Sequence, residues 1–293
     1  MITSAPSFLH QGHTYAQAQT VILPISYERT TSYRKGTAQG PEALLRASEQ
    51  LEFYEYETRT MPCETGIFTH PILGFADSEP IESCLDRIYS TALPLYASGK
   101  FVVGVGGEHT ITTPLVRALS GVHSRPFGIV QVDAHFDMRD TYDGTPWSHA
   151  CMLRRCREIV PQTLSLGIRA FSAEEAAVAA AENIPFLTDR QLWERGYRIS
   201  DMLSVLPEDV YLTIDLDFFS PAEIPATGTP VPGGPPWWEG LWVIQQVFQH
   251  KKVIGMDIVE LMPLSHDSRS DFAAAHLLYK CLAYRHIQKT DRP

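Results

Sequence analysis

The sequence predicts an α/β fold in which helices cover both faces of a parallel sheet. Short apolar runs recur along the chain, and segments with helical spacing separate them. The runs are nearly continuous rather than alternating, as expected for strands that are buried on both faces. Regular alternation of strands and helices favours parallel pairing. The expected strands are residues 20–25, 101–104, 127–132, 163–168, 210–214 and 253–257.

Local signals mark the helices between these strands. Pro41 stands where a first helical residue is expected, and Ser172 with Glu175 forms the pattern of a capping box. Ser148 is a candidate N-cap, and Pro94 is expected to kink the helix that contains it. The expected helices are residues 41–53, 80–100, 149–160, 173–182, 237–250 and 271–288.

Size and composition limit the classes of protein that fit. The 293 residues, 44% of them hydrophobic, are enough for a single domain over residues 1–293. A net charge of −10 without a Lys/Arg cluster argues against nucleic-acid binding and suits a cationic substrate. No apolar run is long enough to span a membrane, and the first residues do not resemble a secretory signal. The five cysteines form no CxxC pair, so we expect reduced thiols in a cytoplasmic protein.

Acidic and histidine side chains follow three of the predicted strands. They are Glu108 and His109 after residues 101–104, then Asp133, His135 and Asp137 after residues 127–132, and finally Asp215 and Asp217 after residues 210–214. Ligands of parallel sheets lie outside the carboxyl ends of the strands, so we expect these side chains to meet at one edge. If residues 133–137 continue as a regular strand, their alternate positions also point to one face.

A bound cation explains this concentration of carboxylates. Four buried aspartates would repel one another strongly, and a multivalent cation removes that cost. Carboxylates with two imidazoles and no thiolate favour a hard ion such as Mn²⁺ over a structural zinc. Six ligands exceed what one ion needs from its protein, so we expect two ions about 3.5–4 Å apart that activate a water.

Each part of this pattern also has a simpler interpretation. A lone Asp-x-Asp is commonly a solvated turn, and a lone His109 is more often an ordinary buried histidine. Residues 104–107 suggest a nucleotide loop, but the third glycine of GxGxxG and the lysine of a P-loop are missing. Three strand ends with the same residue types make a metal site the better interpretation.

Three motifs resemble those of the ureohydrolase superfamily, which includes arginases and agmatinases. Residues 106–109 (GGEH) resemble the family's Gly-Gly-Asp-His motif, and residues 133–137 (DAHFD) match its Asp-Ala-His-x-Asp motif. The third family motif is followed over its full length by residues 213–234, TIDLDFFSPAEIPATGTPVPGG. The order and spacing agree, and the similarity runs from about Ser32 to the final helix.

The resemblance implies an arginase-like fold, a three-layer α/β/α sandwich with a mainly parallel sheet, and two Mn²⁺ ions per subunit. The implied ligands are His109, Asp133, Asp137 and Asp215 for one ion, and Asp133, His135, Asp215 and Asp217 for the other. A hydroxide between the ions would attack the guanidinium carbon of the substrate and release urea, and Asp137 would accept a hydrogen bond from it. A homo-oligomer, either a trimer or a hexamer, is also implied.

Two further residues are implied to act on the substrate. His149 resembles the family's proton-shuttling histidine, and a place in the first turn of a helix would lower its pKa. Glu260 matches the glutamate that pairs with the guanidinium, and a carboxylate suits that planar cation. The simpler interpretation of Glu260 is an exposed residue at a strand end. Cys151 lies near His149, but a Cys/His nucleophile is disfavoured because the metal site already supplies one.

Departures from the family pattern leave all six predicted ligands in place. Glu108 replaces the usual aspartate, and Ala150 replaces the usual glycine beside His149. Ser220 stands where many members have an acidic residue before Pro221. Ala150 would narrow the pocket, which bears on substrate choice more than on chemistry.

Residues that follow the motifs limit the range of candidate substrates. The arginase pattern for the α-amino and α-carboxylate groups is absent, and residues 139–150 look more like the agmatinase branch. We therefore expect agmatine, giving putrescine in polyamine biosynthesis, or a derivative such as aminopropylagmatine. Asp140, Tyr142, Asp143 and Trp147 are candidate contacts for the tail of the substrate. A solvated loop with an Arg139–Asp140 ion pair is equally compatible.

Three alternatives stay open at this point. Arg139 would favour guanidinobutyrate if it met a carboxylate of the substrate. A deacetylase-like amide hydrolase usually has a single metal and would not need six ligands or Glu260. A non-catalytic metal-binding regulatory relative typically loses ligands, and none is lost here.

Overall fold

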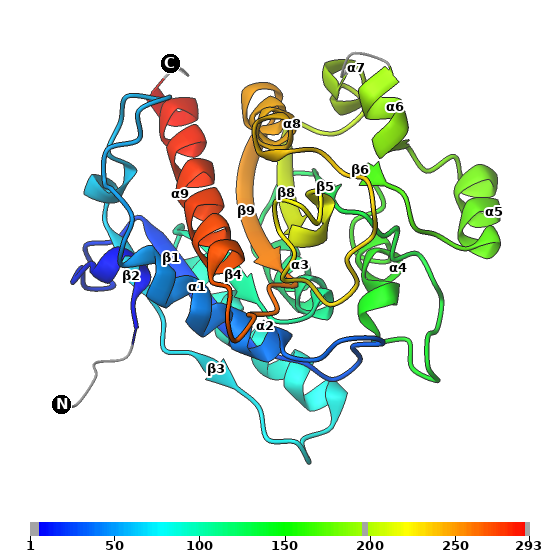
Figure 1. Ribbon diagram of the computed structural model, residues 1–293, viewed down its shortest axis with the longest axis horizontal. Helices are drawn as coiled ribbons and strands as arrows, with labels where there is room; N and C mark the ends of the chain where they lie inside the picture. The colour runs from blue at the N-terminus through cyan, green and yellow to red at the C-terminus, as the bar shows by residue number, and fades with distance from the viewer. Residues whose placement is uncertain (1–5, 195–198, 291–293) are drawn as a thin grey trace.

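The computed structural model describes residues 6–194 and 199–290, and its strands form one nine-stranded sheet (Figure 1). The strands are β1 (Thr20–Ser26), β2 (Ile67–Thr69), β3 (Leu73–Gly74), β4 (Phe101–Gly106), β5 (Phe127–Val132), β6 (Thr163–Ile168), β7 (Phe186–Thr188), β8 (Asp209–Asp215) and β9 (Lys252–Val259). Their order is β2-β1-β4-β9-β8-β5-β6-β7, and β3 also pairs with β1. All of these pairings are parallel, as the sequence predicted.

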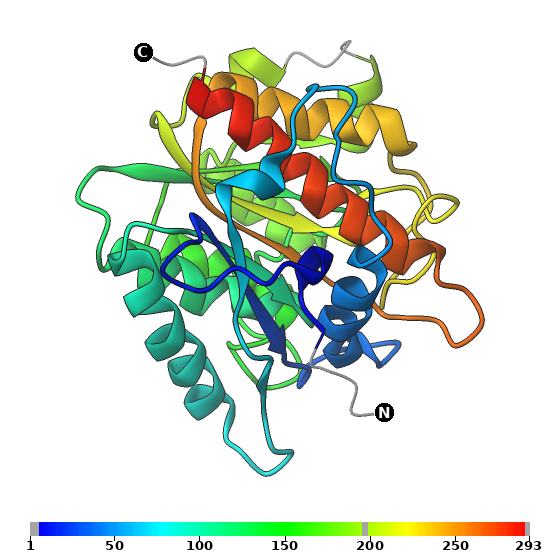
Figure 2. The same cartoon turned by 90° about the vertical axis from the view of Figure 1, so that its left-hand side faces the viewer.

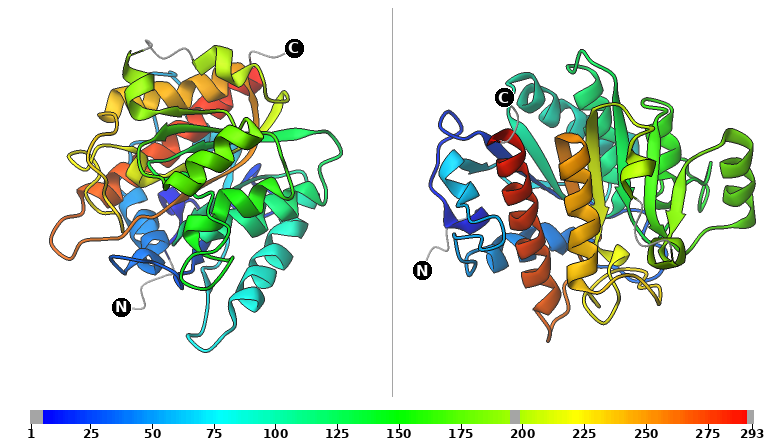
Figure 3. Two further views of the ribbon diagram at one scale, coloured as in Figure 1. Left: turned by 90° about the vertical axis from the view of Figure 1, so that its right-hand side faces the viewer. Right: turned by 90° about the horizontal axis from the view of Figure 1, so that it is seen from above.

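Helices cover both faces of this sheet (Figures 1 and 2). They are α1 (Gly40–Ser48), α2 (Ile81–Ala97), α3 (Thr112–Ser120), α4 (Met152–Arg157), α5 (Ala173–Glu182), α6 (Asp189–Glu194), α7 (Ile199–Leu203), α8 (Trp237–His250) and α9 (Arg269–Thr290). Buried residues of α1 and α6 to α9 form one core with the sheet, and those of α2 to α5 form the other. The three-layer α/β/α sandwich is therefore confirmed, and Figure 3 shows its layers from two further sides.

Side chains of each strand divide between the two cores. In β1, Ile22 packs in the core under α1 and α9, whereas Val21 and Leu23 pack in the core under α2 and α3. This follows from the period of two along a strand. Because both faces are buried, nearly every position must be apolar, which explains the continuous runs in the sequence.

The predicted strands are all present, and their ends extend by up to two residues beyond the predicted bounds. Three short strands were not predicted: β2 and β3, which pair with β1 on one side of the sheet, and β7, which pairs with β6 at the other. These short strands contain partly buried positions, so they lack the continuous apolar run that marked the central strands.

Three helices are shorter than predicted. The first begins at Gly40 and ends at Ser48 rather than at Phe53, and the Ser48 hydroxyl donates to the carbonyl of Leu45, 2.6 Å away. The segment after Ser148 forms a 3-10 turn, His149–Cys151, and then α4, which ends at Arg157 rather than at Val160. The helix α2 continues through Pro94 but ends at Ala97 rather than at Lys100.

The capping box of α5 is confirmed. The Ser172 hydroxyl accepts from the backbone N–H of Glu175 at 3.2 Å, and the Glu175 carboxylate accepts from the backbone N–H of Ser172 at 2.7 Å. Among the described residues, no helix is both long and apolar enough to cross a membrane.

Four neighbouring central strands, β4, β9, β8 and β5, carry the predicted site residues at their carboxyl ends (Figure 1). Strands β4 and β5 come earlier in the sequence, and β8 and β9, which come later, lie between them in the sheet. Segments that are far apart in sequence thus end side by side at one edge.

Candidate metal centre and active site

The structure brings the six predicted metal ligands together with His149 and Glu260 around one cavity of about 160 Å³. The residues on its wall are His109, His135, Asp137, His149, Asp215, Asp217 and Glu260. The remaining predicted ligand, Asp133, is fully buried and lies against His109. Glu260 is also buried, so the interpretation as an exposed strand-end residue is wrong.

The loop after β5 places its three ligands by an irregular path. Strand β5 ends at Val132, so residues 133–137 are not the regular strand whose alternation we considered. The Asp133 carboxylate accepts from the backbone N–H of His135 at 2.6 Å, which turns the chain. Asp137 has a φ of 56°, a left-handed conformation that is uncommon for a residue with a side chain. Convergence of the three side chains depends on this strained turn rather than on strand geometry.

The first group of candidate ligands surrounds Nδ1 of His109. Carboxylate oxygens of three aspartates lie 3.1, 3.2 and 3.3 Å from this nitrogen, and they belong to Asp133, Asp137 and Asp215 respectively. Nδ1 is buried without a hydrogen-bond partner among the described residues. A nitrogen and three carboxylates at this separation match the four ligands expected for one ion.

The opposite nitrogen of His109 shows why Nδ1 is available as a ligand. Nε2 lies 2.8 Å from the hydroxyl of Thr213, which donates its own proton to the buried Asp257 carboxylate at 2.6 Å. The hydroxyl therefore accepts from Nε2–H, which leaves the lone pair on Nδ1. Four acceptors then converge with no donor between them, and a metal cation fits this arrangement.

The second group of candidate ligands is centred on His135. Its Nδ1 lies 2.8 Å from Asp217 Oδ2 and 3.9 Å from Asp133 Oδ1. One ligand atom from each of these three residues lies within 4.8 Å of the others. Asp133 belongs to this group and to the group around His109, as expected of a carboxylate shared by two ions.

The electrostatics of the cluster agree with a need for positive charge. Burial and the charge of Asp137 raise the pKa of Asp133 to about 6, and burial with Asp217 and Asp133 raises that of Asp215 well above its usual value. Burial also opposes the ionised form of Asp217, but His135, Arg169 and the backbone N–H of Ala134 together outweigh burial and lower the pKa of Asp217 to about 2. The carboxylates thus repel one another unless cations lie among them. All the candidate metal ligands are carboxylate oxygens or imidazole nitrogens, and this set of ligand atoms fits Mn²⁺.

Glu260 is held beside this cluster by backbone groups. Its Oε1 accepts from the N–H of His109 at 2.7 Å, and its own N–H donates to the carbonyl of Gly107 at 2.8 Å. Its φ is 66°, so the backbone is strained here too. Burial and the charge of Glu108 raise the pKa of Glu260 well above its usual value. A cationic group in the cavity would stabilise the ionised form of this buried carboxylate.

His149 faces the same cavity from the turn that Ser148 caps. The Ser148 hydroxyl accepts from the N–H of Ala150 at 3.4 Å. The pKa of His149 is lowered, as predicted, and burial is the largest cause. Cys151 is buried, and burial raises its pKa to about 11, so it is a neutral thiol rather than a nucleophile. Cysteines 63, 84, 151, 156 and 281 are all free and buried, as expected of reduced thiols.

The loop of residues 139–150 contributes less than predicted. Arg139 and Tyr142 line the cavity, but Asp140 and Asp143 do not. Asp140 pairs with Arg155 at 2.6 Å, so the Arg139–Asp140 ion pair is not formed. Trp147 packs against the core under α2 and α3.

Two cavity-lining residues, Ser32 and Thr229, were missed by the sequence analysis or lay unremarked within a motif. Ser32 follows β1, and Thr229 lies in the third motif. Thr30, which also follows β1, does not line the cavity but contacts His149. The signal for Ser32 and Thr30 was available, because the carboxyl end of β1 lies beside that of β4 and polar residues follow it.

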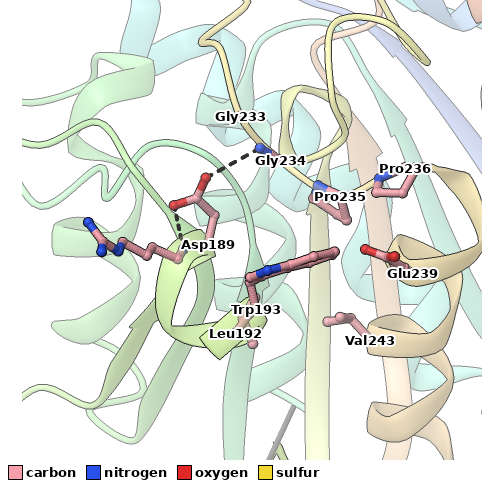
Figure 4. A pocket seen from close by; sticks show the side chains of 10 residues that line it. Asp189, Leu192, Trp193, Gly233, Gly234, Pro235, Pro236, Glu239 and Val243 are labelled. Atoms are coloured by element: carbon pink, nitrogen blue, oxygen red, sulfur yellow. Dashed lines mark hydrogen bonds between the residues drawn. The ribbon is translucent and has the colours of Figure 1, made fainter. Parts of the chain in front are cut away.

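A second cavity of about 240 Å³ lies between α6 and the start of α8 (Figure 4). Trp193 and Glu239 line it, and Asp189 accepts there from the N–H of Gly234 at 3.3 Å. None of the predicted site residues reaches this cavity, so the chemistry belongs to the smaller one.

A family model described as the arginase family matches residues 18–284, nearly the whole chain. The chain belongs to the arginase family. The resemblance inferred from the three motifs is confirmed, and the arginase-like fold with it.

Individual members of the arginase family resemble the chain over most of its length. A Synechocystis sp. protein named N(1)-aminopropylagmatine ureohydrolase is 44% identical over 276 residues, covering 92% of this chain and 90% of that protein. A Pyrococcus horikoshii protein named agmatinase is 31% identical, covering 89% and 90% respectively. The solved structure of the agmatine ureohydrolase of Thermoplasma volcanium superimposes with a TM-score of 0.89 at 29% identity, over 100% of this chain and 98% of that one.

Proposed function

We propose that this arginase-family member releases urea from agmatine or from N(1)-aminopropylagmatine, using two Mn²⁺ ions per subunit. The observation that carries the proposal is the convergence of six carboxylate and imidazole ligands with Glu260 on one cavity. The similarity to a named N(1)-aminopropylagmatine ureohydrolase supports the substrate class. The acidic cavity suits a guanidinium cation.

Each site residue has a distinct role in this proposal. The Mn²⁺ ions, when bound, supply a nucleophilic water at neutral pH. Glu260 accepts hydrogen bonds from the guanidinium and orients its carbon. Asp137 accepts a hydrogen bond from the attacking water, and His149 delivers a proton to the amine as it leaves. The proposed ligands are His109, Asp133, Asp137 and Asp215 for one ion, and Asp133, His135, Asp215 and Asp217 for the other.

The proposal extends to the whole protein. A single catalytic domain over residues 1–293 and a homo-oligomer, trimer or hexamer, follow from the family resemblance. A cytoplasmic location agrees with the five free cysteines.

A guanidinobutyrate-specific enzyme is the second candidate, because Arg139 lies on the cavity wall. Its guanidinium lies 5.0 Å from the ring centre of Tyr142, and its Nε is 3.8 Å from the Glu175 carboxylate. A substrate carboxylate would compete with Glu175 for this cation.

Urea release from a panel of guanidino compounds tests the proposal. Mn²⁺-loaded protein is incubated with agmatine, N(1)-aminopropylagmatine, guanidinobutyrate and arginine, and chelator-treated protein serves as the control. We expect urea from one or both of the first two compounds, and little from arginine. A preference for guanidinobutyrate would favour the second candidate. No urea from any compound, with two metal ions bound per subunit, would contradict both.

A further inference from the structure

A series of hydrogen bonds leads from Glu108 through Thr30 to the ring of His149. The Thr30 hydroxyl oxygen lies 2.8 Å from Glu108 Oε1, 3.0 Å from the backbone nitrogen of His149 and 3.1 Å from its Nδ1. Glu108 is completely buried, and Thr30 lies outside the three family motifs. The donors present fix the direction of each hydrogen bond.

Glu108 acts only as an acceptor in this arrangement. Its Oε2 receives the backbone N–H groups of Arg29 and Thr30 at 2.8 and 2.7 Å, and neither group can accept in return. Its Oε1 receives the hydroxyls of Thr30 and Thr110, both at 2.8 Å. A carboxylate has about four lone-pair sites, so these four donors fill them. The proton of Thr30 is therefore committed to Glu108.

Thr30 can then only accept from His149. A hydroxyl has one proton and two lone pairs, and its proton already points to Glu108. One lone pair accepts the backbone N–H of His149, and the other faces Nδ1. Two lone pairs cannot bond to each other, so Nδ1 must carry a hydrogen.

We propose that Glu108 and Thr30 are positioning residues that fix neutral His149 as the Nδ1–H tautomer and leave Nε2 to exchange the proton in the cavity. The consequence for rate rests on the proposed ureohydrolase function, whereas the tautomer does not. Burial lowers the pKa of His149, which keeps the ring neutral near neutral pH. Without this support the ring could adopt either tautomer, and only one of them presents a proton acceptor at Nε2.

Neutron diffraction tests the tautomer directly. Crystals of the metal-loaded protein are exchanged into D₂O at a pD well above the usual histidine pKa. We expect deuterium on Nδ1 of His149 and none on Nε2. Deuterium on Nε2 alone would overturn the proposal, whatever reaction the protein catalyses.

In the variant Glu108→Gln, we expect the opposite tautomer of His149. The two backbone N–H groups require an oxygen at the Oε2 position, so the amide NH₂ must take the place of Oε1. It would donate to Thr30, whose proton would turn to Nδ1 of His149. Neutron diffraction should then find the deuterium on Nε2. An unchanged tautomer in this variant would contradict the role given to Glu108.

Kinetics of Thr30 variants separate positioning from a purely structural role. Thr30→Val keeps the shape but removes both hydrogen-bond functions, and we expect kcat for urea release to fall about 10- to 100-fold with KM nearly unchanged. Thr30→Ser should restore most of the rate. Thr110→Val is the matched control, since Thr110 also donates to Glu108 but has no hydrogen bond to His149; its kcat should stay near that of the wild type.

The outcomes distinguish this proposal from the proposed function. Wild-type kcat in Thr30→Val, with thermal melting and metal content like those of the wild type, would overturn the role of Thr30. If the wild type released no urea from any guanidino compound, the proposed function would fail, and the neutron result would still decide the tautomer.

Discussion

At the scale of single residues, Glu260 is kept in a costly state. It combines a left-handed backbone, burial and a pKa raised by burial and by Glu108. Its side chain accepts from the N–H of His109 and its own N–H donates to the carbonyl of Gly107, and these two hydrogen bonds fix it there. Strain of this kind persists only where the surroundings enforce it, and it gathers at functional sites. A guanidinium cation is the partner that such a carboxylate would bind best.

Replacing Glu260 by glutamine should therefore reduce activity without emptying the metal centre. Glu260→Gln keeps the size and loses the charge, so a charge-assisted hydrogen bond worth about 1.5–3 kcal/mol is weakened, and kcat/KM for urea release should fall about 10- to 100-fold. Metal analysis should still find two ions per subunit. Glu182→Gln, on the surface beside Arg154, is the control and should behave like the wild type. An unchanged kcat/KM in Glu260→Gln would exclude its proposed contact with substrate.

Site residues that belong to one short motif were predicted from the sequence, whereas contacts between residues far apart in the sequence were missed. Asp133, His135 and Asp137 stand within one short motif, so their chemistry is visible locally. Thr30 contacts His149 across 119 positions, and no local pattern carries that contact. Asp140 was expected at the cavity and instead pairs with Arg155, 15 positions away, because α4 brings that arginine beside it.

At the scale of elements, the same distinction holds. The capping box predicted the start of α5, since both of its hydrogen bonds join residues three positions apart. The short strands β2, β3 and β7 depend on pairing with β1 or β6 and have little apolar pattern of their own. The left-handed turn at Asp137 was hidden for the same reason, because the surroundings impose it.

The packing of α9 against the segment after α1 supplies a prediction for stability. Lys280 of α9 is fully buried, and its ammonium group lies 2.5 Å from Glu55 and 2.7 Å from Glu57. Lys280→Ala would leave the buried Glu55 without its partner, so we expect a loss of about 3–5 kcal/mol in the free energy of unfolding. Arg46→Ala, which breaks an exposed pair with Glu42, should cost under about 1 kcal/mol. Denaturant titrations of both variants measure the difference.

The dependence of this contribution on pH has a definite sign. Burial raises the pKa of Glu55, but the hydrogen bond and charge of Lys280, together with the backbone N–H groups of Thr58 and Glu57, outweigh burial and lower the pKa below its usual 4.5. A lowered pKa in the folded state means that the contribution is present above pH 4.5 and is lost as pH falls through the folded value. The difference in stability between wild type and Lys280→Ala should therefore shrink in acid. A difference that stays constant, or grows, would show that packing rather than charge carries the effect.

At the scale of the whole molecule, the candidate metal centre joins parts of the chain that are distant in sequence. Its ligands follow β4, β5 and β8, and Glu260 follows β9, so four central strands converge on it. An unfolded chain cannot present these ligands together. Metal binding should thus favour the folded state, and the gain should appear in the melting temperature.

Addition of Mn²⁺ to metal-free protein should raise the melting temperature by about 10–20 °C when both sites fill. A free metal concentration of about 100 times the Kd contributes about 2.7 kcal/mol per site, and each kcal/mol shifts the melting temperature of a large domain by about 2–4 °C. Scanning calorimetry with and without a chelator measures the shift. Asp133→Asn removes the carboxylate common to both ligand groups, so this variant should lose most of the increase. An equal increase in Asp133→Asn would mean that Mn²⁺ stabilises the protein from another site. Asp133 belongs to both ligand groups, so neither proposed site keeps all its ligands in this variant.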